Sequence, residues 1–149
     1  MVGRLMAAAE AGDLEQILEC LAAGVPIEAT DSRRNTALHV AAGNGRWEVL
    51  EYLVCAGANV NARNRYGATP LHSAAYSDTS GTCTAALLNA GARINVVDAD
   101  GWTPLHAAAA FTNSTSMQLL QSAGADPEAR NSYGFKPLDL AFFRRLLEN

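Results

Sequence analysis

The sequence has few cysteines, and their placement argues against metal or redox chemistry. Only three occur in 149 residues, and Cys20, Cys55 and Cys83 are too far apart to form a Cys-x-x-Cys pair. No cysteine and histidine cluster has the spacing of a zinc site either. An odd number of cysteines without a regular framework is typical of a reducing compartment.

Long apolar runs are also missing. No stretch of about 18 apolar residues could span a membrane as a helix. The N-terminal residues lack the basic segment, apolar core and cleavage site of a secretory signal. We therefore expect a cytoplasmic or nuclear protein without membrane insertion. Asn113-Ser114-Thr115 matches the N-glycosylation pattern, but without a secretory signal we interpret this match as chance.

Motifs for catalysis and nucleotide binding do not occur. The chain contains no G-x-S-x-G nucleophile turn, no G-x-x-x-x-G-K phosphate loop and no G-x-G-x-x-G fingerprint. Its formal net charge of -4 offers no basic surface for a phosphate backbone, which disfavours nucleic acid as a partner. We expect no enzymatic activity, no cofactor and no metal site.

The chain has instead an internal repeat with a period near 33 residues. Matching residues of successive copies are 33, 34 and 33 positions apart. Such a period, with a T-P-L-H motif in phase, indicates stacked helix pairs joined by turns. The copies are RNTALHVAA at 34–42, YGATPLHSAA at 66–75, DGWTPLHAAA at 100–109 and the altered YGFKPLDLA at 133–141, and Gly24, Gly57, Gly91 and Gly124 keep the same spacing.

These motifs resemble those of the ankyrin-repeat family over nearly the whole chain. The resemblance implies an all-α solenoid of stacked helix-turn-helix units with β-hairpin-like turns. The last unit ends before a full second helix, so it is either a compact cap or a piece cut from a longer protein. We expect a single domain over 1–149, with an N-terminal capping repeat at 3–32, repeats at 33–64, 65–98 and 99–131, and a partial C-terminal capping repeat at 132–149.

Local signals predict where helices begin and end. Thr36 is placed to cap a helix through its hydroxyl, and Pro70 and Pro104 suit the first helical position. Gly24 suits a left-handed helix end. The repeat at 65–98 carries one extra residue between its two helices, in the polar run 77–82. We therefore expect the second helix to start late and to be short there, and likewise in the next repeat.

Three histidines, His39, His72 and His106, share one position of the repeat. The resemblance implies that each imidazole bridges backbone groups of neighbouring loops. Histidines one repeat apart are also too distant to share a metal ion. Asp139 replaces histidine in the last unit, which has no following repeat to bridge, and this favours a structural role over a catalytic one.

Repeat phase predicts which other side chains are buried. Cys20 and Cys83 align with apolar positions of second helices, so we expect both in the core. Cys55 lies beside a helix end and is expected to be exposed. Trp47 aligns with Leu14 at the start of a second helix, and we expect it in the core.

Ankyrin domains usually hold partners on the tips of their turns and on the inward side of their first helices. The resemblance therefore implies a concave binding face, and aromatic and arginine residues, which are enriched at interface hot spots, gather on these positions. The alternative is that the turn aromatics only pack on neighbouring turns. The expected partner-binding residues are Arg33, Asn35, Asn44, Arg65, Tyr66, Tyr76, Ser77, Asp100, Trp102, Phe111, Tyr133 and Phe135.

The resulting hypothesis is an adaptor or scaffold that is monomeric alone and binds a protein or peptide on its concave face. Trp102 is the expected central anchor, with Phe135 as its neighbour. An inhibitor that blocks the active site of a partner enzyme is the alternative. Asn61 and Asn95 resemble asparagines that are hydroxylated in many ankyrin domains, but a plain turn asparagine that bonds to the backbone is the favoured interpretation of both.

Overall fold

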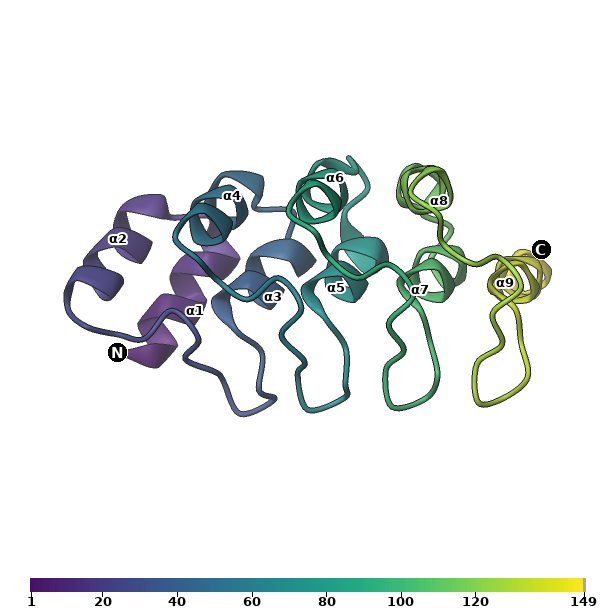
Figure 1. The fold of residues 1–149 in the computed structure, drawn as a ribbon, viewed down its shortest axis with the longest axis horizontal. Helices are drawn as coiled ribbons and strands as arrows, with labels where there is room; N and C mark the ends of the chain where they lie inside the picture. Colours follow the sequence, from purple (N-terminus) through teal and green to yellow (C-terminus); the bar gives the residue numbers. More distant parts are fainter. Residues whose placement is uncertain (149) are drawn as a thin grey trace.

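The computed structural model describes residues 1–148, which form an all-α stack of helix pairs. In Figure 1 the first helices α1, α3, α5, α7 and α9 form one layer, and the second helices α2, α4, α6 and α8 form the other. Long turns project from the first-helix layer, and the two termini lie at opposite ends of the stack. The helices are α1 Val2–Ala11, α2 Leu14–Ala22, α3 Ala37–Gly43, α4 Trp47–Cys55, α5 Pro70–Ser77, α6 Thr82–Asn89, α7 Pro104–Ala110, α8 Ser114–Ser122 and α9 Pro137–Leu147.

The repeated motif sets the start of each first helix. The Thr36 hydroxyl accepts the backbone N–H of His39 at the start of α3, as predicted for an N-cap. Pro70 and Pro104 occupy the first positions of α5 and α7, where the missing N–H has no helical partner to lose. None of the helices in the described part of the chain is long and apolar enough to cross a bilayer.

The second helix of the third repeat differs from our expectation. We expected α8 to start late and to be short, but it has nine residues, as α4 does. The reason is Asn113, whose side-chain oxygen accepts the Ser116 N–H at 3.1 Å and caps the helix. Only α6, with eight residues, is shortened, because the extra residue of its repeat lengthens α5 and the linker that follows.

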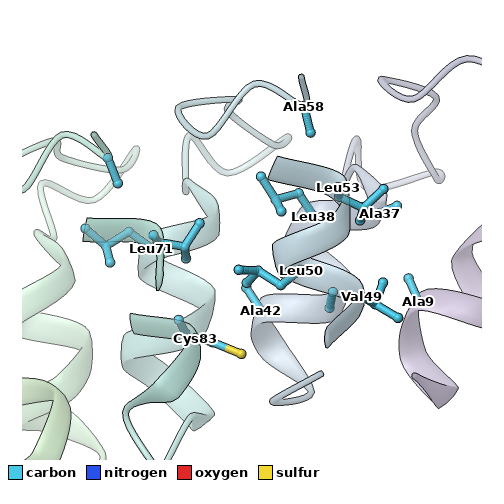
Figure 2. Packing of buried hydrophobic residues seen from close by; sticks show 14 of the residues in the cluster. Ala9, Ala37, Leu38, Ala42, Val49, Leu50, Leu53, Ala58, Leu71 and Cys83 are labelled. Carbon is cyan, nitrogen blue, oxygen red and sulfur yellow. The ribbon is translucent and has the colours of Figure 1, made fainter. Parts of the chain in front are cut away.

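The core lies between the two layers and is built from small and aliphatic residues (Figure 2). The alanine pairs of the motif are fully buried, which lets the first helices α3, α5 and α7 pack closely on one another. Cys20 and Cys83 are buried and Cys55 is exposed, as predicted. Burial, followed by the charge of Asp78, raises the pKa of the Cys83 thiol to about 12. The buried leucines are Leu5, Leu38, Leu50, Leu53, Leu71, Leu87, Leu105 and Leu120.

Trp47 does not lie in the core, in contrast to our expectation. Its side chain is 46% exposed at the first position of α4. Leu14, the residue aligned with it in α2, is itself only partly buried. The start of a second helix therefore lies at the rim of the stack, where sequence phase gives no guarantee of burial.

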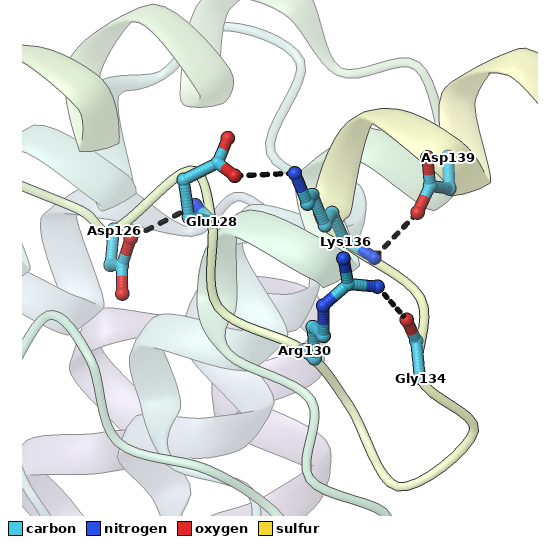
Figure 3. A network of polar contacts seen from close by, with 6 residues as sticks. All are labelled: Asp126, Glu128, Arg130, Gly134, Lys136 and Asp139. Atoms are coloured by element: carbon cyan, nitrogen blue, oxygen red, sulfur yellow. Dashed lines mark hydrogen bonds and ion pairs between the residues drawn. The ribbon is translucent and has the colours of Figure 1, made fainter.

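The last turn is held by a polar network in place of the threonine cap (Figure 3). Lys136 stands where the other repeats have threonine, and its backbone N–H donates to the Asp139 carboxylate at 2.8 Å. The Lys136 ammonium pairs with Glu128, and Arg130 donates to the Gly134 carbonyl at 2.7 Å. Asp139 thus accepts the N–H of the N-cap residue, as the histidine ring does in the other repeats.

One linker position carries a residue in an unfavourable conformation. Gly12 and Gly45 take positive φ angles of 80° and 67° between the helices of their pairs, and Thr112 takes 53° at the corresponding place. This left-handed region is disfavoured for a β-branched residue. We expect Thr112→Gly to raise the free energy of unfolding by roughly 1 kcal/mol, measured by urea denaturation, because relief of strain exceeds the added chain entropy.

Gly45→Ala is the matched control for this prediction. A Cβ at Gly45 would meet nothing within 4 Å, so only the backbone conformation penalises it. We expect this variant to lose about the stability that Thr112→Gly gains. A Thr112→Gly variant no more stable than the parent would contradict the argument.

Candidate functional site

Each projecting turn is closed at its base by one carboxylate or amide side chain. Asp98 Oδ1 accepts the backbone N–H groups of Asp100 and Trp102, both at 2.9 Å. Asn64 Oδ1 accepts those of Tyr66 and Ala68 in the same way. Asp and Asn side chains commonly close turns in this way. Their spacing of one repeat is visible in the sequence, but we did not predict this role. Asp31 and Asn131 close the first and last turns equivalently.

The three histidines join successive repeats. Each Nδ1 accepts the backbone N–H of the capping threonine of its own helix, at 3.2, 3.1 and 3.1 Å. Each ring must therefore be neutral and carry its proton on Nε2. His39, His72 and His106 donate that proton to the carbonyls of the next turn, at 3.0, 2.8 and 2.9 Å. The predicted structural role is confirmed, and the acceptors are Ala68, Trp102 and Phe135.

Burial makes two of these histidines sensitive to acid. It lowers the pKa of His39 and His72 below the ordinary value of 6.5. The unfolded chain takes up protons at that ordinary value while the folded chain does not, so stability is complete above it and is lost as pH falls toward the lowered pKa. We expect the urea midpoint to fall between about pH 7.5 and about pH 5.5, before most carboxylates titrate. A flat profile over that range would contradict this prediction.

A cavity of about 420 Å³ lies between the turns and the first helices of the second and third repeats. Tyr76 and Trp102 supply its large aromatic side chains, and small residues supply much of the rest. Ala68 occupies the position that Trp102 holds one repeat later, and this small side chain leaves space beside the indole. We call this cavity the central groove, and it is lined by Gly43, Ala68, His72, Ser73, Tyr76, Ser77, Asp98, Trp102 and Ala107.

Three of the predicted binding residues, Tyr76, Ser77 and Trp102, line the central groove. Tyr76 is 53% exposed and Trp102 is half-buried. The indole ring lies 6.3 Å from the His106 ring. The remaining predicted residues lie outside the groove: Arg33, Arg65, Tyr66, Asp100 and Tyr133 are exposed on the turns, and Asn35, Asn44, Phe111 and Phe135 lie nearer the helices.

The aromatic side chains of this face form two groups instead of one ridge. The Tyr76 and Phe111 ring centroids are 3.7 Å apart, beside the groove. Phe135 lies 5.4 Å from Phe143 of α9, so its ring partner is this residue and not Trp102, its expected neighbour. Trp102 is therefore the aromatic residue that the turns contribute to the groove.

Two of the predicted asparagines use their side chains within the fold. Asn35 donates to Asp31 and accepts from Asn64, and Asn44 donates to the Val40 carbonyl. Each amide thus has part of its hydrogen-bonding capacity occupied within the fold. A partner would therefore gain less from Asn35 or Asn44 than from the exposed aromatic residues.

The two candidate hydroxylation sites also connect neighbouring repeats. Asn61 Oδ1 accepts the Arg93 N–H at 2.8 Å, and Asn95 Oδ1 accepts the Asp126 N–H at 2.9 Å. Both side chains thus have a structural function. Hydroxylation of either residue stays a prediction. Within residues 1–148, no group of three His, Cys, Asp or Glu side chains is placed to hold a metal ion.

Comparison with known proteins identifies the repeat. The family profile described as "Ankyrin repeats (3 copies)" matches residues 5–98 and 78–148. The chain is 34% identical over 115 residues to the Transient receptor potential cation channel subfamily A member 1 homolog of Caenorhabditis elegans, covering 77% of this chain and 10% of that protein. It is 40% identical over 73 residues to Serine/threonine-protein kinase 12 of Arabidopsis thaliana, covering 49% and 16%.

A third relative is the RelA-associated inhibitor of Mus musculus, 44% identical over 50 residues, which cover 34% of this chain and 6% of that protein. The chain thus spans no more than 16% of the length of these three relatives. Each of these three proteins is far longer than the segment that matches this chain.

Proposed function

This chain belongs to the ankyrin-repeat family, and we propose that it is an adaptor or scaffold that binds a protein or peptide on its concave face. Ankyrin repeats are a generic protein-binding module. The observation that carries the proposal is the central groove, an opening of about 420 Å³ with Tyr76 and Trp102 among its lining residues. Tyrosine and tryptophan are the residues most enriched among interface hot spots.

The exposure of the neighbouring aromatic residues supports the same surface as the binding site. Tyr66 and Tyr133 on the turns are 54% and 65% exposed. Aromatic side chains grouped on one face expose apolar area that water solvates poorly, and such patches commonly mark interaction sites. A partner seated on the groove would cover Tyr76 and Trp102 first and the turn tyrosines at its margin.

The alternative function is inhibition, in which binding to this face covers the active site of a partner enzyme. One relative is named as an inhibitor, which motivates the alternative without assigning that relative's target to this chain. The two functions share the surface and differ in the effect on the partner. If the partner is an enzyme, an inhibitor lowers its activity and an adaptor leaves it unchanged.

Affinity capture with matched variants tests the proposal. Immobilised parent protein, Trp102→Ala and Trp47→Ala are incubated with the same cell extract, and the retained proteins are identified by mass spectrometry. Trp47 is a suitable control because it is 46% exposed on α4, outside the groove. We expect a partner that the parent and Trp47→Ala retain and Trp102→Ala loses. Retention by Trp102→Ala with loss by Trp47→Ala would place binding on another face.

A further inference from the structure

We propose that the partner inserts a basic side chain, lysine or arginine, into the central groove. Its aliphatic stem would lie against Tyr76 and Trp102, and its charged head would pair with the Asp98 carboxylate. The inference rests on the proposed function, since it names the chemistry of the residue that this surface accepts.

The charge of the groove carries the inference. Asp98 is the one acidic side chain among the lining residues, and no lysine or arginine lines the groove. His72 is neutral, because its Nδ1 accepts the Thr69 N–H while its Nε2 donates to the Trp102 carbonyl. Asp100, on the same turn, is exposed and adds a second negative charge beside the groove. The groove therefore favours a cation.

The Asp98 carboxylate has room for a further partner. Both hydrogen bonds that it accepts within residues 1–148 go to Oδ1, from the Asp100 and Trp102 N–H groups. Oδ2 is left to accept from a ligand. Arg63 of the neighbouring turn lies close to this carboxylate, but its guanidinium donates to the Gly67 and Val97 carbonyls and makes no hydrogen bond to Asp98 within residues 1–148.

Energetics separate a basic anchor from an apolar or acidic one. An apolar side chain that filled the groove would remove water from Asp98 without replacing its hydrogen bonds, which is costly for a charged group. An acidic side chain would add repulsion to that cost. A lysine or arginine head restores a charge-assisted hydrogen bond, and aromatic faces attract a cation further.

The same face already holds one guanidinium in this manner. Arg144 lies over the Phe111 ring at 5.2 Å from its centroid, and its Nη1 donates to the Ala110 carbonyl at 3.1 Å. Phe111 in turn contacts Tyr76, a residue of the groove. An arginine from a partner would thus repeat, beside Tyr76 and Trp102, an arrangement that the chain makes with its own Arg144.

Asp98→Asn removes the charge and keeps the turn. The chain itself supplies the evidence, because Asn64 and Asn131 close their own turns with the same two backbone hydrogen bonds. Glu51→Gln is the matched control, since it changes the net charge equally at an exposed site on α4. Urea denaturation checks that both variants stay folded.

The probes are N-acetyl-arginine amide, N-acetyl-lysine amide and the uncharged N-acetyl-norleucine amide, titrated into labelled protein and followed by NMR. We expect the basic probes to shift the Trp102 indole N–H signal, with about tenfold weaker binding in Asp98→Asn and none of this loss in Glu51→Gln. Norleucine amide binding as tightly as the basic probes, or Asp98→Asn binding them unchanged, would overturn the inference.

Captured partners separate this inference from the proposed function. Loss of the partner in both Trp102→Ala and Asp98→Asn supports both. Loss in Trp102→Ala alone overturns the basic anchor and leaves the binding face in place. Retention in both variants overturns the proposed function together with the inference.

Discussion

Leu105→Ala is expected to lower the free energy of unfolding by about 2–5 kcal/mol, whereas Leu138→Ala should lower it by less than about 1 kcal/mol. The two leucines occupy the same motif position, Leu105 in α7 and Leu138 in α9. Leu105 is 1% exposed and Leu138 is 56% exposed. Truncating the first leaves a cavity in a packed layer, and truncating the second removes a side chain that water already reaches.

The difference arises from the neighbours of each first helix. Leu105 lies under α8, which packs on α7. Within residues 1–148 α9 has no second helix of its own repeat, and Phe142 is 62% exposed where the aligned Ala109 is 0% exposed. Leu138 and Phe142 line a pocket with Ser114 and Met117 of α8, yet both side chains remain more than half exposed.

Urea denaturation followed by circular dichroism measures both variants at one temperature. Leu71→Ala, at the same position of the second repeat and 0% exposed, is the matched control and should behave like Leu105→Ala. Equal losses for Leu105→Ala and Leu138→Ala would show that motif position decides the cost. The structure instead predicts that burial decides it.

The fold was predictable because each motif residue has one local task that its type reveals. Threonine caps the helix, proline occupies its first position, leucine fills the core and histidine reaches the next turn. These tasks recur with the same period, so a single copy would have been ambiguous while four copies were not. Repetition also explains why burial of Cys20 and Cys83 could be read from their phase.

The parts that were missed depend on side-chain geometry that phase does not contain. The run around Asn113 has the composition of a loop, yet this residue caps α8 because its amide also reaches the Ala75 and Asp78 carbonyls of the preceding repeat. Trp47 aligns with Leu14, an apolar residue that is itself only partly buried, and lies at the rim. Such outcomes follow from contacts between repeats, which no single repeat specifies.

The groove could be anticipated only in part. Trp102 was singled out because aromatic residues on turns suggest binding, but its cavity exists because Ala68 and Gly43 are small where other repeats have larger side chains. Asp98 was not singled out, although its position recurs as Asp31, Asn64 and Asn131. Comparing residue size at equivalent positions would have indicated the cavity, and comparing residue type would have indicated Asp98.

Trp102→Ala is expected to weaken binding of the captured partner at least about thirtyfold, which corresponds to roughly 2 kcal/mol. The indole supplies a large apolar surface in the groove, and an alanine there would leave a partner side chain without that contact. Tyr76 would remain in place, so some affinity should persist. Titration of the purified partner by calorimetry or fluorescence anisotropy measures the change.

The same variant should remain folded. The fold uses hydrogen bonds of the Trp102 backbone: the carbonyl accepts from His72 Nε2 at 2.8 Å and the N–H donates to Asp98 Oδ1 at 2.9 Å, and alanine keeps both. The half-buried side chain should therefore cost less stability than the roughly 3–5 kcal/mol of a buried core tryptophan. Unchanged affinity, or an unfolded Trp102→Ala protein, would remove Trp102 from the binding surface, because the first outcome denies contact and the second makes the indole a core residue.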